Sequence, residues 1–145
     1  MPNIVIPRDT AWLCGADWGS NSPGCILWAF DVGDGHWHLG RELKFQHESV
    51  EDVCKKWHAM NKEMALRSKC QAFILDPACW TNAGDSIASL FQRYKVPIVK
   101  GNHDRKNGWA RMRELLRLAP DGRPWLTIDT VRCPYLVRTL PMGTS

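Results

Sequence analysis

Two aspartates end two short apolar segments, and residues of this type in this position can hold a metal ion. Asp17 follows Trp12-Leu13-Cys14-Gly15-Ala16, and Asp76 follows Ala72-Phe73-Ile74-Leu75. Each apolar run predicts a buried strand. Because a carboxylate is costly to bury, one at the end of a core strand is expected at an open edge with a partner.

Two such strand ends on adjacent strands would put two carboxylates side by side. A hard divalent cation such as Mg²⁺ or Mn²⁺ relieves the repulsion between them. Paired cations held in this way are the usual apparatus of phosphodiester cleavage. The simpler alternative is that Asp17 and Asp76 only cap the ends of their strands.

The bulk composition is that of one globular domain. The chain has 145 residues, of which 44% are hydrophobic and 23% charged, which is enough for one core and ordinary for a soluble protein. No apolar run reaches the roughly 18 residues that a membrane helix needs. The six cysteines form no CxxC pair, so we expect reduced, buried thiols in a protein of the cytoplasm rather than a zinc site.

A basic segment follows Asp76 in the chain. Residues 95–123 hold eight lysines and arginines and three acidic residues, a net charge of +5 in a chain whose formal net charge is +4. A basic segment beside a carboxylate site favours a nucleic-acid substrate, although a solvated helix face would look the same. The candidate phosphate contacts are Lys100, Arg105, Lys106 and Arg111, and such contacts carry no base-sequence information.

The elements that must position these residues follow from periodicity and turn signals. We expect strands over 12–18, 25–32 and 36–45, joined by short turns into an antiparallel meander. A helix capped by Ser49 and running to about residue 67, a strand over 71–75, a helix capped by Asp85 or Ser86 and a short strand over 96–99 follow. Further expected elements are a helix over 105–118, a strand over 125–128 and a short helix or extended segment over 131–140.

This order predicts an α/β fold with a ribonuclease H-like mixed sheet, an antiparallel three-strand meander plus parallel strands, flanked by helices. The first and fourth strands become plausible neighbours, with Asp17 and Asp76 at the same edge.

Several other polar residues are weaker candidates for the site. Asp104 and Asp129 are expected to cap the segments that follow them, and either could substitute as a ligand. Glu42 could face the metal edge or pair with a basic residue. His36 and His38 share one face of a strand without a third ligand nearby, so we expect surface histidines. His103 is a candidate phosphate or water contact, and Trp80 a candidate stacking surface for DNA.

Several short motifs together resemble the C-terminal nuclease domain of bacteriophage terminase large subunits. They are Gly15-Ala16-Asp17-Trp18-Gly19, Arg41-Glu42-Leu43, Leu75-Asp76-Pro77-Ala78, Asp104-Arg105-Lys106-Asn107-Gly108-Trp109, Asp121-Gly122-Arg123-Pro124 and Arg138-Thr139-Leu140-Pro141. No single motif is specific, but their order and spacing extend over about residues 11–141.

The resemblance implies a metal-dependent endonuclease that cuts concatemeric double-stranded viral DNA with two bound Mg²⁺ or Mn²⁺ ions. By position, Asp17 matches the first acidic residue of the family and Asp76 the second. The implied partners are an ATPase domain, a small terminase subunit and the portal, in the cytoplasm of a bacterial host. Residues 1–10, with Pro2 and Pro7, are expected to be a leader or linker remnant. The resemblance implies a nuclease domain over 11–145, truncated at its C-terminus.

The family's third acid lies after the Leu-Pro segment, and no residue here matches it. The chain would then be an excised piece of a longer protein or the product of a truncated prophage gene. Two alternatives stay open. One is a catalytically impaired DNA-binding or motor-docking domain, and the other is a different ribonuclease H-like nuclease, such as a junction resolvase or an enzyme that cuts RNA–DNA hybrids.

Overall fold

Six strands and two helices make up the described part of this computed structural model. It describes residues 6–7, 9–17, 24–33, 36–75, 79, 86–100 and 126–134. In chain order the elements are β1 (Trp12–Asp17), β2 (Gly24–Gly33), β3 (His36–Phe45), α1 (Val50–Met64), β4 (Cys70–Leu75), α2 (Ile87–Arg93), β5 (Ile98–Lys100) and β6 (Leu126–Ile128). None of the described helices is long and apolar enough to cross a membrane.

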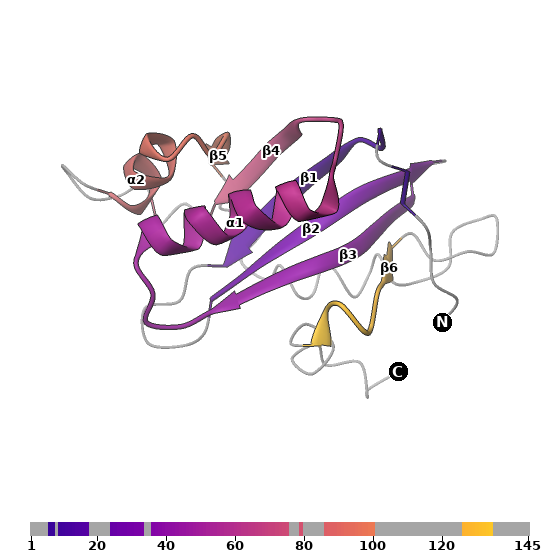
Figure 1. The fold of residues 1–145 in the computed structure, drawn as a ribbon, viewed down its shortest axis with the longest axis horizontal. Helices are drawn as coiled ribbons and strands as arrows, with labels where there is room; N and C mark the ends of the chain where they lie inside the picture. The colour runs from indigo at the N-terminus through magenta and orange to yellow at the C-terminus, as the bar shows by residue number, and fades with distance from the viewer. Residues whose placement is uncertain are drawn as a thin grey trace.

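The strands form one mixed sheet in the order β5-β4-β1-β2-β3-β6 (Figure 1). β1, β2 and β3 pair antiparallel, while β4 pairs parallel with β1 and β5 parallel with β4. The predicted ribonuclease H-like sheet and the predicted parallel contact between the first and fourth strands are therefore confirmed. The expected helix over 105–118 lies outside the described residues.

Local signals in the sequence explain where the helices begin and end. The Ser49 side chain accepts a hydrogen bond from the N–H of Asp52, and Ser86 caps α2 through the N–H of Ser89, as the N-cap rule predicts. The first helix ends before the predicted residue 67, because Ala65 adopts a left-handed conformation with φ of 54°. Its N–H donates to the carbonyl of Lys62, which closes the last turn.

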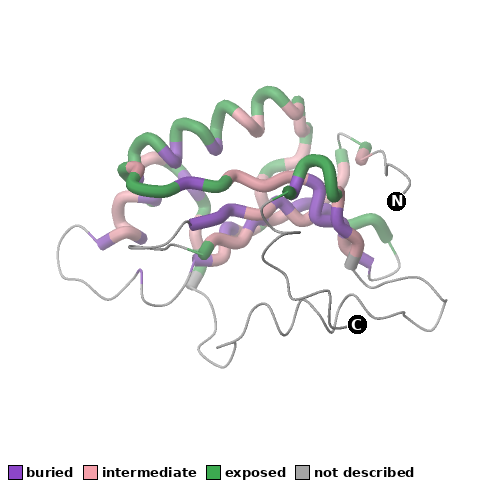
Figure 2. The backbone as a smooth tube through the Cα atoms, turned by 90° about the horizontal axis from the view of Figure 1, so that it is seen from below, coloured by how far each residue is buried: buried purple, intermediate pink, exposed green. Residues whose placement is uncertain are grey.

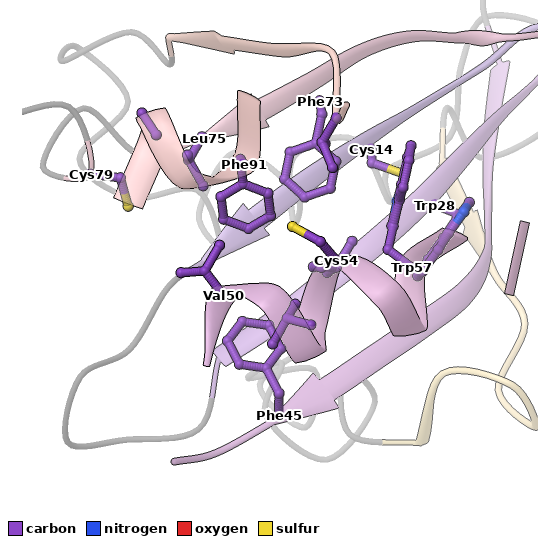
Figure 3. Packing of buried hydrophobic residues seen from close by; sticks show 14 of the residues in the cluster. Cys14, Trp28, Phe45, Val50, Cys54, Trp57, Phe73, Leu75, Cys79 and Phe91 are labelled. Carbon is purple, nitrogen blue, oxygen red and sulfur yellow. The ribbon is translucent and has the colours of Figure 1, made fainter. Parts of the chain in front are cut away.

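Both helices cover the same face of the sheet, and the core lies between them and that face (Figures 1 and 2). Phe73 of β4 packs edge-on against Trp57 of α1, with ring centroids 5.6 Å apart, and lies 5.2 Å from the ring of Phe91 in α2 (Figure 3). Edge-on and tilted aromatic pairs add to the stabilisation from area burial. Of the five core positions predicted on the first helix, Val50, Val53 and Trp57 are buried, and Met60 and Met64 are partly buried against the core.

Each buried tryptophan on this face has a partner for its indole N–H. Trp12 donates to the carbonyl of Ser68 at 2.8 Å, and Trp28 donates to Oδ1 of Asn61 at 2.7 Å. Trp57 donates to the Sγ of Cys14 at 3.4 Å. Large rings can therefore fill the core without leaving an unsatisfied donor. The cysteines are all free thiols, five of them buried, as the sequence predicts.

Candidate metal and nucleic-acid site

Three parallel strands end in one row at one edge of the sheet. Ala16 of β1 pairs with Leu75 of β4, and Leu75 pairs with Lys100 of β5. The next residue along β1 is Asp17, and the chain position after Leu75 is Asp76, which lies outside the described residues. The carboxyl ends of adjacent parallel strands are where open α/β sheets bind ligands.

Alternation along β1 decides where the Asp17 side chain can go. Trp12 and Cys14 are buried in the core beneath the helices. Because successive side chains of a strand point to opposite faces, Leu13, Gly15 and Asp17 face away from the helices. Asp17 is exposed, whereas Trp12 and Cys14 on the opposite face of the same strand are buried, so Asp17 ends β1 outside the core.

A second carboxylate lies on the same face of the sheet as Asp17. Asp17 pairs with Cys25 of β2, and Glu42 of β3 pairs with Leu27, two residues further along β2. Burial raises the pKa of the Cys25 thiol to about 12, and the negative charges of Glu42 and Asp17 add to the effect. Cys25 therefore remains a neutral thiol near two carboxylates, and we expect the oxygens rather than the sulfur to attract a cation.

Asp129 does not join this group. Asp129 follows β6, and β2 and β3 separate β6 from β1. The Oδ1 of Asp129 accepts the N–H groups of Val131 and Arg132, each at 3.0 Å, as the predicted capping role requires. Burial alone would raise the pKa of Asp129, but these two hydrogen bonds and the charge of Arg132 outweigh it and lower the pKa.

The prediction that His36 and His38 are surface residues is wrong, because both are buried, at 4% and 3% exposure. β6 pairs with β3 from Trp37 to Leu39, and the Nδ1 of His38 lies 2.6 Å from the Oγ1 of Thr127. Burial lowers the pKa of His38, the charge of Arg132 lowers it further, and Asp129 opposes both. Nothing near His38 in the sequence signals this burial, since the covering strand lies far along the chain, at Leu126–Ile128.

The structure describes little of the remaining predicted site residues. Lys100 is the last residue of β5, and only its backbone is described. Asp76, Trp80, His103, Asp104, Arg105, Lys106 and Arg111 lie outside the described residues. Among the residues that the structure describes, no three histidine, cysteine or acidic side chains come together as a metal cluster.

The chain has the fold of large-terminase nuclease domains from several bacteriophages. It superposes on 33% of the large terminase of a thermophilic bacteriophage with a TM-score of 0.70, at 12% sequence identity and 95% coverage of this chain. For the nuclease domain of the P22 large terminase the TM-score is 0.61, at 13% identity and with 92% of this chain and 69% of that chain covered. For the SPP1 large-terminase nuclease domain with bound Mn the TM-score is 0.53, at 15% identity. The match covers 91% of this chain and 67% of the SPP1 chain.

Sequence comparison alone finds no such relationship. No protein-family model matches the chain, and no curated protein matches it. The chain spans about a third of the large terminase from the thermophilic bacteriophage.

Proposed function

We propose that this chain is the metal-dependent nuclease domain of a phage DNA-packaging terminase large subunit and that it cleaves double-stranded DNA. The observation that carries this proposal is the row Ala16–Leu75–Lys100, which ends three adjacent parallel strands beside an exposed aspartate. The manganese held by the SPP1 domain of the same fold supports a divalent cation here.

The donor set fits a hard cation. Asp17 is an exposed residue with a carboxylate side chain, and continuation of the parallel register would put Asp76 beside it. We propose Asp17 and Asp76 as ligands, with water completing the roughly six oxygens that Mg²⁺ or Mn²⁺ takes. Two such ions, when bound, would activate a water molecule and stabilise the leaving oxygen. In this proposal the basic residues described next hold and orient the phosphate group.

The DNA contacts in this proposal come from the segment after β5. Lys100 ends the strand next to β4, and Arg105, Lys106 and Arg111 follow it in the basic segment. Cations next to a carboxylate site attract the phosphate backbone without reading bases. An ATPase domain, a small terminase subunit, the portal and the cytoplasm of an infected bacterium complete this proposed setting.

Nicking of supercoiled plasmid in Mn²⁺ tests the assignment. Asp17→Asn should reduce nicking at least ~100-fold, more than the roughly 10–100-fold that loss of an outer-shell partner causes at metal sites. The matched control is Asp9→Asn, which changes an exposed aspartate at the opposite end of β1 and should leave nicking unchanged. Full activity of Asp17→Asn would contradict the proposed site.

Salt dependence of DNA binding tests the phosphate contacts. Neutralising about four phosphates predicts a log–log slope near −3.6 on duplex DNA. Changing Arg105 and Lys106 together to alanine should reduce its magnitude by roughly two units. The control is Lys55 and Lys56 changed together to alanine, an adjacent basic pair on α1 that is bridged to Glu51 and Glu48. Equal effects of the two double variants would exclude a specific role for the segment after β5.

The same preparation separates the alternatives. Normal DNA binding without nicking by the wild-type chain would favour a binding or motor-docking domain. Preferred cleavage of an RNA–DNA hybrid or of a four-way junction would favour a different ribonuclease H-like nuclease.

A further inference from the structure

A cavity of about 570 Å³ lies at the other end of the sheet from Asp17. Its lining includes Phe30, which pairs with Trp12 at the start of β1, whereas Asp17 ends that strand. At about 3.3 Å per residue the two ends of β1 are roughly 17 Å apart. The cavity also lies on the face that the helices cover, since Met64 of α1 lines it. It is therefore separate from the proposed nuclease site.

The walls of this cavity are apolar over part of their surface. Ile6, Phe30, Met64, Leu66 and Val131 contribute hydrophobic side chains. Val131 is 79% exposed, so an apolar residue stands at the rim without being covered. A volume of this size falls within the usual range for small-molecule pockets, and apolar walls favour a flat or hydrophobic body over a hydrated ion.

A buried imidazole with one unused nitrogen also lines the cavity. His38 is 3% exposed, and its Nδ1 is engaged with the hydroxyl of Thr127. Within the described ranges, its Nε2 has no hydrogen-bond partner. Buried polar atoms are rarely left unpartnered in proteins, so a ligand in this cavity gains by offering a hydrogen-bonding group to this nitrogen.

The charged residues around the cavity leave cationic donors available. The Asp129 side chain is 11% exposed, and its oxygens already accept two backbone N–H groups and one N–H of Arg132 at 3.3 Å. Arg132 is 60% exposed and a guanidinium has five donors, so further N–H groups can bind an anion. Arg41 makes a long 3.6 Å pair with Glu63, whose side chain is 68% exposed and well hydrated.

We propose that this cavity binds a small organic anion with a flat ring system: the ring lies between the apolar walls and hydrogen-bonds to Nε2 of His38, and one anionic group binds Arg132 and Arg41. A nucleoside monophosphate and an aromatic carboxylate share this chemistry. An inorganic ion alone would leave the apolar walls and His38 unused.

Isothermal titration calorimetry with the whole chain compares deoxyadenosine monophosphate, indole-3-carboxylate and inorganic phosphate. At least one organic anion should bind with Kd below about 1 mM, and inorganic phosphate at least tenfold more weakly. Tighter binding of deoxyadenosine monophosphate would identify a nucleotide as the ligand class. Tighter binding of indole-3-carboxylate would identify an aromatic acid. Failure of both organic anions to bind below about 10 mM, or equal binding of inorganic phosphate, would overturn the proposal.

Variants and one spectroscopic signal place the ligand in this cavity. Arg132→Gln should weaken binding about tenfold, as expected for loss of a charged hydrogen bond, whereas Arg67→Gln, an exposed arginine that does not line the cavity, should leave it unchanged. The ¹⁵N resonance of Nε2 in His38 should shift on titration in the wild-type chain, which needs no substitution in the buried site. Binding that moves neither this resonance nor the affinity of Arg132→Gln would place the ligand elsewhere and refute the site.

Discussion

The two faces of the sheet differ in burial along β1 and β4. On the face beneath α1 and α2, Trp12, Cys14 and Phe73 are at most 3% exposed. On the other face of the same strands, Leu13 and Ile74 are only partly buried and Asp17 is exposed. The difference separates two roles. Packing on the helix face stabilises the domain, and on the other face β1 ends in an exposed residue that can carry chemistry. Figure 2 shows buried and exposed positions alternating along the chain.

Loss of a large side chain on the helix face should have the largest effect on stability. Phe73→Ala should lower the free energy of unfolding by about 3–5 kcal/mol, because the ring fills a closed space against Trp57 and Phe91. Urea denaturation measures the change. The matched control is Val99→Ala on β5, whose side chain is 42% exposed and should change stability by less than about 0.5 kcal/mol. Similar losses in both variants would show that the faces do not differ in packing.

The position of α1 over its face depends partly on its N-terminus. Ser49→Ala should lower the free energy of unfolding by about 1 kcal/mol, since the hydroxyl accepts the N–H of Asp52 at 3.1 Å. Ser49→Asp should retain most of this contribution, because aspartate is an equally good N-cap residue. A Ser49→Asp variant as unstable as Ser49→Ala would contradict the capping role.

A polar group on the packed face should make stability depend on pH. Burial, with a contribution from Arg132, lowers the pKa of His38 in the folded protein below its usual value near 6.5. The unfolded chain then binds more protons just below about pH 6.5, so stability should fall as the pH drops from about 6.5 towards the folded pKa. Thermal unfolding between about pH 7.5 and 5 measures this, and His38→Gln should flatten that part of the profile. An unchanged profile in His38→Gln would assign the pH dependence to other groups.

The smallest expected effect on stability comes from the residue with the largest expected effect on activity. Asp17→Asn should change the free energy of unfolding without metal by no more than about 0.5 kcal/mol, because its side chain is exposed and asparagine keeps the same shape. Mn²⁺ should raise the melting temperature of the wild-type chain and not that of the variant. A large loss of stability in metal-free Asp17→Asn would make this aspartate a structural residue instead.

The sequence predicts most of the described fold because its signals are local. The strand predicted over His36–Phe45 has both ends correct, and the helix after Ser49 begins where its cap requires. Period-two alternation is enough to place Asp17 at the exposed end of β1. The sequence also predicts that β4 lies next to β1, because hairpin and crossover connections permit few topologies.

The errors arise where residues distant in the sequence meet. Pairing of β6 with β3 buries His38, and no periodic pattern within β3 reports that contact. A second long-range feature, for which the sequence makes no prediction, is the shift in register of β1 with β4, where Cys70 pairs with Trp12 and Phe73 with Cys14. Such irregularities depend on the packing of both strands. Whether Asp76, Arg105, Lys106 and Arg111 act as predicted stays a prediction, because these residues lie outside the described part of the chain.

The central position of β1 also has a consequence for the order of folding. β1, β2 and β3 are consecutive along the chain and antiparallel, so their contacts close short loops and should form early. β4 reaches β1 only after the crossover through α1, which closes a longer loop. The strand ends that carry Asp17 and Leu75 therefore become neighbours late. A cation that needs both ends would bind only chains in which this docking is complete, so that the rate at which refolding chains take up metal would report the last step of assembly.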